Sequence, residues 1–196
     1  MNKKEFEITI DDEIRKKWHQ GYDRTKREWN GKLVSIPITE IVIHGTAGLG
    51  TYEWVRDGGR AKEYKQGIAL FHYIIEYDID MIREIEPTEK AFYHSSSGKH
   101  DLSTIGIEIE NPNKLNSALY LERQYEQLTS LILDFLIPKY PTIKNVVGHN
   151  FNATVYSNKP KRECPGPKFD WSKITNELDR RKISYAKVNK EAIKLL

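Results

Sequence analysis

The strictest constraint on the fold is one segment whose side chains alternate between apolar and polar along the chain. Residues 103–110 read Ser-Thr-Ile-Gly-Ile-Glu-Ile-Glu, which has the two-residue period of a β-strand. Three isoleucines share one face of this strand: Ile105, Ile107 and Ile109. Glu108 falls on the opposite face, together with Gly106 and Glu110. We therefore expect the isoleucine face to be buried and Glu108 to be turned away from it.

Several other segments have the length and composition of short strands. The β-branched, mostly apolar run Ile38–His44 predicts a buried strand that ends in a histidine. Four further segments are predicted to be extended: Phe71–Tyr77, Met81–Glu86, Ala91–His94 and Asn145–His149. The last of these also ends in a histidine.

Helices are predicted between these strands. Residues Thr51–Gln66 are expected to be helical, with a break at Gly58-Gly59. Apolar residues recur at helical spacing from Leu121 until Pro138, which ends the helix, so this segment should pack against the sheet. The order of strands and helices is not a regular βαβ series and contains no repeat. It predicts an α/β fold, a single domain with a central mixed β-sheet flanked by helices.

Two charged terminal segments are expected to flank the main domain. Residues 1–36 are predicted to be an N-terminal extension, a short strand followed by a helix, packed on a main domain at 37–171. Residues 172–196 are predicted to be a C-terminal basic helical extension, with enough apolar residues to dock on the domain. The net charge is only +3, but residues 159–196 hold eleven basic and five acidic residues. Because no stacking aromatics interleave with these charges, they predict a solvated helix face rather than a nucleic-acid site.

The composition excludes several classes of protein. With 38% hydrophobic and 30% charged residues, the chain has the mix of a packed protein rather than a disordered one. No run approaches the ~18 consecutive apolar residues of a membrane span, and the N-terminal residues lack the apolar stretch of a signal peptide. We therefore expect synthesis in the cytoplasm and no membrane partner. A single cysteine rules out an internal disulfide.

Two strand-end histidines and the single cysteine are candidates for chemistry. His44 and His149 close predicted strands, and Cys164 follows in Cys-Pro-Gly-Pro. Imidazole nitrogen and thiolate sulfur are favoured zinc donors, and three protein donors with an open position are typical of a catalytic site. Taken singly, each has a simpler interpretation, because strand-end histidines often form ordinary hydrogen bonds and a lone cysteine is often inert packing.

Six segments together resemble a known family. In chain order they are IVIHGTAG, FHYIIEYD, AFYHSSS, STIGIEIEN, VVGHN and KRECPGPKFDW. Their order and spacing are similar to the type 2, zinc-dependent N-acetylmuramoyl-L-alanine amidases, over about residues 37–171. This family includes phage lysozymes of the amidase type, bacterial amidases that recycle cell-wall fragments, and animal peptidoglycan recognition proteins. The resemblance implies the amidase type 2 or peptidoglycan-recognition-like fold.

The resemblance also implies roles for individual residues. It makes His44, His149 and Cys164 the ligands of one Zn²⁺ cofactor. It makes Glu108 the carboxylate that orients or deprotonates the water that attacks the amide. Arg162 stands where family members often have a lysine that stabilises the developing oxyanion; arginine can donate there but cannot give up its proton. A surface charge is the competing interpretation of Arg162.

Two substrate contacts and one departure from the family are implied by the same resemblance. His94 falls in a segment that often lines the substrate groove, and Thr46 comes two residues after the first ligand, so both are expected to contact the substrate. Phage lysozymes of the family have a catalytic tyrosine where Phe71 stands here. Tyr73 and Tyr93 are the candidates for supplying a phenol instead.

The implied function is hydrolysis of the amide between N-acetylmuramic acid and L-alanine, in peptidoglycan or in soluble muropeptides. The alternative is a non-catalytic peptidoglycan-binding recognition protein. Cys164 argues against it, because the recognition proteins of this family that only bind the wall lack the zinc cysteine. Without a signal peptide, either a lysin released at lysis or a recycling enzyme is compatible with the chain. The oligomeric state is not fixed by the sequence, and a monomer is favoured.

Overall fold

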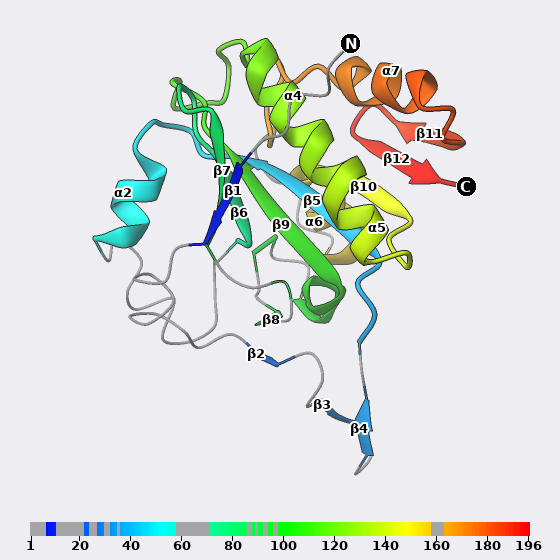
Figure 1. The fold of residues 1–196 in the computed structure, drawn as a ribbon. Coiled ribbons are helices and arrows are strands. Elements are labelled where there is room, and N and C mark those ends of the chain that lie inside the picture. The colour runs from blue at the N-terminus through cyan, green and yellow to red at the C-terminus, as the bar shows by residue number, and fades with distance from the viewer. Residues whose placement is uncertain are drawn as a thin grey trace.

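A central mixed sheet organises the protein (Figure 1). The computed structural model describes residues 7–10, 22–23, 27–29, 32–34, 36–57, 71–85, 88, 90–91, 94–95, 98–157 and 163–196. Eight strands form the sheet in the order β1-β7-β6-β9-β5-β10-β12-β11. Their bounds are β1 Glu7–Ile10, β5 Glu40–Gly45, β6 Tyr73–Ile75, β7 Met81–Glu84, β9 Thr104–Ile109, β10 Asn145–Gly148, β11 Tyr185–Asn189 and β12 Ala192–Leu195.

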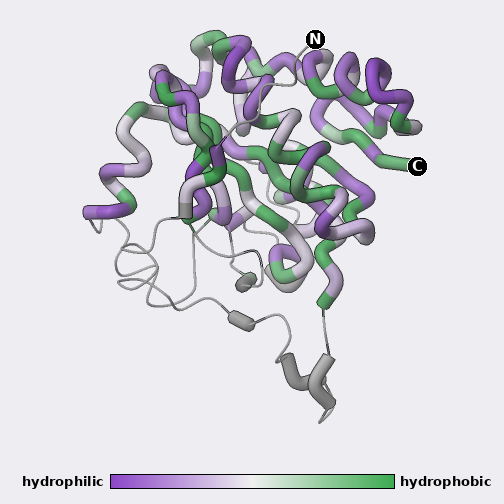
Figure 2. Tube along the Cα trace, viewed as in Figure 1, coloured by the Kyte–Doolittle hydropathy of each residue, from purple (hydrophilic) through white to green (hydrophobic). Residues whose placement is uncertain are grey.

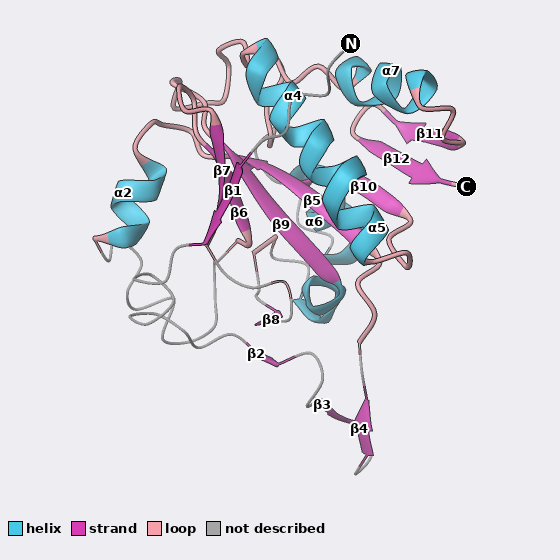
Figure 3. Cartoon of the chain, viewed as in Figure 1, coloured by secondary structure: helices cyan, strands magenta, loops and turns pink. Residues whose placement is uncertain are grey.

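Short helices and two small ribbons surround this sheet (Figure 3). The helical segments are α2 Thr51–Arg56, η2 Gly98–Ser103, α4 Glu122–Ser130, η3 Leu131–Leu136, α5 Ile137–Lys139, α6 His149–Ser157 and α7 Ser172–Arg180. The ribbons pair β2 (Tyr22–Asp23) with β8 (Lys90–Ala91), and β3 (Arg27–Trp29) with β4 (Lys32–Val34). No helix among these described residues is long and apolar enough to cross a membrane.

The four central strands of the sheet are parallel, and their outer neighbours β7 and β12 pair antiparallel with them. Strands β6, β9, β5 and β10 run in the same direction. β7 and β12 pair antiparallel with β6 and β10. The predicted central mixed sheet flanked by helices is therefore confirmed. Parallel strands end at one common edge, and open α/β sheets bind ligands outside that edge.

The two faces of the sheet have different chemistry. On one face, the isoleucines of β5 and β9 pack against the long helical segment formed by α4, η3 and α5 (Figure 1). On the other face, Val42 and Val147 pack with Phe151 of α6. Figure 2 shows mostly hydrophobic residues along the central strands, whereas α4 and α7 alternate between hydrophilic and hydrophobic ones. As predicted, Ile105 and Ile107 are fully buried in the main core, and Glu108 faces away from it, only partly buried.

Most predicted elements occur close to their expected bounds. The helix starting at Leu121 extends through Lys139, one residue past Pro138, and its middle part, η3, is a π-helix. Pro138 therefore lies inside the last turn rather than ending the helix, which stops one residue later at Lys139. Of the helix predicted at Thr51–Gln66, α2 accounts for the first turns and residues 58–70 lie outside the described part.

Both terminal segments contribute strands to the central sheet. β1 pairs with β7, which agrees with the strand predicted in residues 1–36. The helix predicted after this strand falls on residues that the structure does not describe. The helical prediction for residues 172–196 is correct for α7 and wrong for the residues beyond it. β11 and β12 form a hairpin, and β12 pairs with β10. The physical reason is that Ala192, Ile193 and Leu195 are buried at the otherwise open edge of β10.

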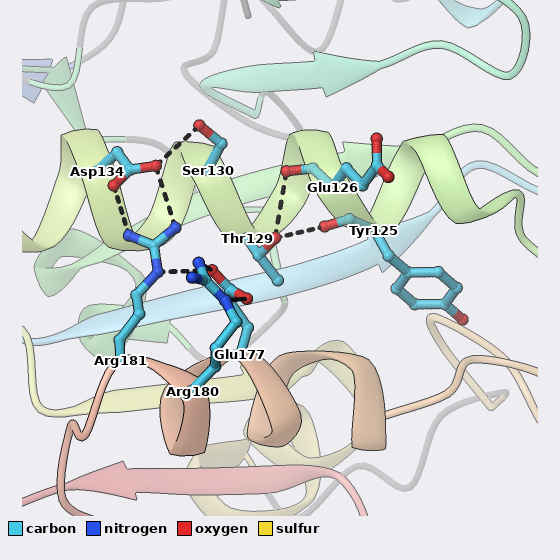
Figure 4. Close-up of polar contacts among 8 residues, drawn as sticks. All are labelled: Tyr125, Glu126, Thr129, Ser130, Asp134, Glu177, Arg180 and Arg181. Atoms are coloured by element: carbon cyan, nitrogen blue, oxygen red, sulfur yellow. Dashed lines mark hydrogen bonds and ion pairs between the residues drawn. The ribbon is translucent and has the colours of Figure 1, made fainter. Parts of the chain in front are cut away.

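An ionic cluster joins α7 to the π-helical segment (Figure 4). The guanidinium of Arg181 donates to both carboxylate oxygens of Asp134 on η3. Arg181 Nε also donates to Glu177 at 2.6 Å, and Arg180 Nε donates to the same carboxylate at 2.7 Å. The hydrogen bonds from Arg180 and Arg181 lower the pKa of Glu177 to about 2. The cluster therefore depends on an ionised Glu177.

Replacing Glu177 should weaken this connection in a pH-dependent way. Because the folded-state pKa is depressed, the stabilisation is present above the ordinary carboxyl pKa and is lost as the pH falls towards 2. Glu177→Gln should destabilise the protein by about 1 kcal/mol at pH 7, with the difference vanishing near pH 2. Thermal unfolding across this range measures it. Glu122→Gln is the matched control, because Glu122 is 64% exposed in its pair with Lys173 and should matter little at any pH.

Candidate metal centre

Three potential metal ligands converge at the carboxyl edge of the parallel strands. His44 lies near the end of β5, His149 follows β10 as the first residue of α6, and Cys164 lies in the loop before α7. One ligand atom from each lies within 4.8 Å of the other two. Within the described part of the chain, this is the one group of three or more such residues close enough to share a metal ion. The structure thus brings together the residues that the sequence had suggested as ligands.

The two histidines face each other through their Nδ1 atoms, which are 3.1 Å apart. His149 Nε2 lies 3.0 Å from the backbone carbonyl oxygen of Ser95. A carbonyl oxygen can only accept, so Nε2 of His149 carries the proton and its Nδ1 presents a lone pair towards His44. A metal-ligating histidine is commonly fixed in this way by a hydrogen bond from its other nitrogen.

The Cys164 sulfur lies beside the start of the loop after β5. The backbone N–H of Gly45 donates to Sγ at 3.3 Å. Burial and the negative charge of Glu108 raise the pKa of the Cys164 thiol to about 12. A thiolate at this position therefore needs a cation next to it, and a metal ion is one way to provide that charge.

Two residues outside the predicted motifs hold the two loops that meet here, Tyr120 the loop that carries Cys164 and Asn116 the loop after β5. The Tyr120 hydroxyl donates to the Pro165 carbonyl at 2.6 Å. Asn116 donates from Nδ2 to the Gly45 carbonyl at 3.1 Å and accepts from the N–H of Ala47 at 2.7 Å. A Cβ on Gly45 would lie 2.6 Å from Asn116, Pro165 and Tyr120, so only glycine fits between them. No motif marks Asn116 or Tyr120, because their role comes from contacts far apart in sequence.

Glu108 lies directly opposite His44 in the pairing of β9 with β5. Its charge reaches the cysteine, since it contributes to the raised pKa of Cys164. Glu110, on the same face of the strand, has a structural role instead. Its carboxylate accepts the N–H of Thr51 at 2.7 Å and the N–H of Tyr77 at 3.0 Å. Glu108 is therefore the carboxylate that the strand pairing places beside His44.

The remaining residues singled out in the sequence have varied positions. His94 Nδ1 is 2.9 Å from His44 Nε2, so His94 lies against a candidate ligand. The Thr46 hydroxyl donates to the Gly48 carbonyl at 2.5 Å, within its own loop. Tyr73 is buried in the main core, with its hydroxyl 3.3 Å from Glu84, on the face away from the candidate site. Arg162 and Tyr93 lie outside the described residues.

The donor set fits a zinc ion. Bonds of about 2.0–2.1 Å to nitrogen and about 2.3 Å to sulfur place donors on one tetrahedral ion roughly 3.3–3.6 Å apart. Here the two Nδ1 atoms are 3.1 Å apart and all three donors lie within 4.8 Å of one another, so small side-chain shifts would bring them to these distances. Two nitrogens and one sulfur are ligands that Zn²⁺ prefers, and three protein donors leave a position for a substrate or water. The facing Nδ1 atoms also favour a cation between them.

Comparison with known proteins agrees with this geometry. The family model described as N-acetylmuramoyl-L-alanine amidase matches residues 34–167, a region that includes His44, Glu108, His149 and Cys164. No curated protein sequence matches the chain.

Several solved structures share the fold. The endolysin and N-acetylmuramoyl-L-alanine amidase LysCS from Clostridium intestinale is 19% identical, with a TM-score of 0.60 over 91% of this chain and 99% of that one. A selenomethionine derivative of AmpD is 25% identical, with a TM-score of 0.53 over 71% of this chain and 83% of that one. The bumblebee protein PGRP-SA is 16% identical, with a TM-score of 0.54 over 88% and 96% of the two chains.

These structures span amidases and a protein named PGRP, so at such identities the fold alone does not separate a hydrolase from a recognition protein. The family model carries more weight, because it covers most of the chain and contains the whole donor set. The chain belongs to the N-acetylmuramoyl-L-alanine amidase family, a class of enzymes that hydrolyse amide bonds.

Proposed function

We propose that this protein is a zinc-dependent hydrolase that cleaves the amide between N-acetylmuramic acid and L-alanine in peptidoglycan or muropeptides. The observation that carries the proposal is the convergence of His44, His149 and Cys164 within 4.8 Å, inside the region that matches the amidase family. A recognition protein that only binds the wall has no need for a complete set of ligands with an open position.

The site would hold the ion through Nδ1 of the two histidines and Sγ of Cys164. A bound Zn²⁺ supplies Lewis acidity, which lowers the pKa of water and polarises an amide carbonyl. Glu108 accepts the proton of the attacking water on its carboxylate and returns it to the departing amino group of L-alanine. Arg162, two residues before Cys164, donates to the developing oxyanion as a fixed positive charge. The scissile C–N bond breaks, and the products are a muramic acid carboxylate and a free peptide amine.

The residues that line the substrate groove around the three ligands select the substrate. Thr46 comes two residues after His44, and the loop after it is tied to Asn111 by a backbone N–H that donates to the Thr46 hydroxyl at 3.4 Å. We propose this loop as one wall of the substrate groove. Both a lysin acting on the intact wall and a recycling enzyme acting on soluble muropeptides suit this chemistry.

The products of digestion test the proposed function. Intact sacculi and a soluble muropeptide are incubated separately with the zinc-loaded protein, and the products are identified by mass spectrometry. We expect new L-alanine amino termini and no new reducing sugar ends, since a glycosidase would produce the latter. Preference for one substrate distinguishes the two biological settings. Binding to sacculi without any product would favour a recognition protein, and cleavage inside the stem peptide would contradict the substrate.

Two variants separate metal binding from proton transfer. Glu108→Gln should keep stoichiometric zinc while the catalytic rate falls by about 10² to 10⁴, because an amide cannot accept the proton. Cys164→Ser should lose zinc and activity together, since a hydroxyl is a much poorer ligand than a thiolate. Zinc content by elemental analysis and rates on the muropeptide check both. A Glu108→Gln enzyme within a few-fold of the parent rate would exclude Glu108 as the base.

A pair of glycine substitutions tests how the loop packing positions the sulfur. Gly45→Ala places a Cβ 2.6 Å from three atoms of the surrounding loops, so we expect a loss of about 1–3 kcal/mol in stability and weaker zinc binding. Gly48→Ala, three residues later, would meet nothing within 4 Å and serves as the control. Thermal unfolding and chelator competition provide the readouts. Equal zinc affinity in both variants would show that this packing does not position Cys164.

A further inference from the structure

We propose that His94 is a positioning residue, which fixes the nitrogen that His44 presents to the metal through a hydrogen-bonded relay anchored on a backbone carbonyl. The proposal rests on the proposed zinc site, but its central evidence is a set of contacts among the protein's own residues. It gives His94 a role different from the substrate contact expected from the sequence.

The relay consists of three consecutive short contacts. His44 Nε2 lies 2.9 Å from His94 Nδ1. His94 Nε2 lies 2.7 Å from the hydroxyl oxygen of Thr104, at the start of β9. The Thr104 hydroxyl donates to the Asp101 carbonyl oxygen at 2.8 Å. Thr104 and Asp101 are both fully buried, so water does not compete for these groups.

The direction of every hydrogen bond is set by the last member. A carbonyl oxygen can only accept, so the single proton of the Thr104 hydroxyl points to Asp101. Thr104 Oγ1 must then accept from His94, which places the His94 proton on Nε2. Nδ1 of neutral His94 is therefore an acceptor, and it takes the proton of His44 Nε2. The remaining lone pair of neutral His44 is on Nδ1.

A second, independent anchor gives the same result for the other histidine. The Ser95 carbonyl fixes the proton of His149 on Nε2. Both Nδ1 lone pairs then point towards the same place, 3.1 Å apart. Two facing lone pairs repel unless a positive charge lies between them. The relay through His94 therefore prepares the histidine pair for a cation before one binds.

The surroundings of His94 hold its ring in this position. A Cβ on Gly106 would lie 2.9 Å from His94 Nδ1, so the ring rests on the one residue of β9 that has no side chain. The ring of His72 lies perpendicular to that of His94, with centroids 6.1 Å apart. His72 is itself fixed, because its Nδ1 accepts the N–H of Gly106 at 3.0 Å. With both ring nitrogens engaged, His94 is better placed to orient His44 than to bind a substrate.

Substitutions at Thr104 test the relay without touching any ligand. Thr104→Val keeps the shape but removes the acceptor of His94 Nε2–H, whereas Thr104→Ser keeps the hydroxyl. We expect Thr104→Val to weaken zinc binding by about 10- to 100-fold, measured by chelator competition, and Thr104→Ser to retain the parental affinity. Thermal unfolding of all three proteins reports any loss of folding.

A second readout does not depend on the metal. ¹⁵N NMR of the histidine side chains in the zinc-free protein at fixed pH should find the proton of His44 on Nε2 in the parent and in Thr104→Ser. In Thr104→Val, His44 should become a mixture of the two neutral tautomers. Should Thr104→Val fail to fold, His94→Phe keeps a ring but removes both nitrogens, and the same loss of affinity and of the single His44 tautomer is expected.

The outcomes separate this proposal from the proposed function. A folded Thr104→Val protein with parental zinc affinity and an unchanged His44 tautomer would overturn the relay. Equal losses in Thr104→Val and Thr104→Ser would also overturn it, because they would reflect packing alone. A parent protein that binds no zinc but shows the Nε2–H tautomer of His44 would contradict the zinc site and support the relay.

Discussion

Parallel pairing of β9, β5 and β10 brings Glu108, His44 and His149 to the same edge of the sheet. The register sets Glu108 opposite His44, and Gly148 of β10 opposite Ile43, so that His149 emerges beside His44. Because all three strands end at one edge, their last side chains share a small volume without any long loop to position them. Cys164 is the exception, since it reaches the same volume from a loop whose Pro165 carbonyl accepts a hydrogen bond from Tyr120.

On the sheet face that carries His44, hydrogen bonds among buried polar groups add to the apolar packing of Val42 and Val147. Glu40 of β5 is only 1% exposed, and its carboxylate accepts from Asn152 of α6 and lies 3.1 Å from His100 Nε2. Ser95 donates from its hydroxyl to Asp101, whose carbonyl ends the relay from His94. Buried polar groups need such partners, and here they connect β5, α6 and η2 behind the histidine pair. The same network therefore supports both the fold and the orientation of the candidate ligands.

The chain is similar in fold to an endolysin named as an N-acetylmuramoyl-L-alanine amidase, to AmpD and to a PGRP, although their identities to it are low. Proteins with different names can share this sheet, because the sheet only provides the edge at which functional residues lie. What distinguishes one member from another is the set of side chains at that edge. Here the set is two histidines, one cysteine and one glutamate.

Local patterns in the chain were enough to predict the strands with clear alternation, the amphipathic helix, and the motifs around His44, Glu108, His149 and Cys164. They also indicated the family, since the order and spacing of the motifs can be matched even when the overall sequence identity to other members is low. The C-terminal hairpin, the roles of Asn116 and Tyr120, and the relay from His94 through Thr104 became visible only in three dimensions. Each depends on groups separated in the sequence, such as β12 on β10 or Tyr120 on Pro165. A hydrogen bond needs its two groups within about 3 Å of each other, and a strand pairs only with an edge that lies beside it. The tertiary fold decides which groups come that close, so a local sequence pattern does not identify the partner.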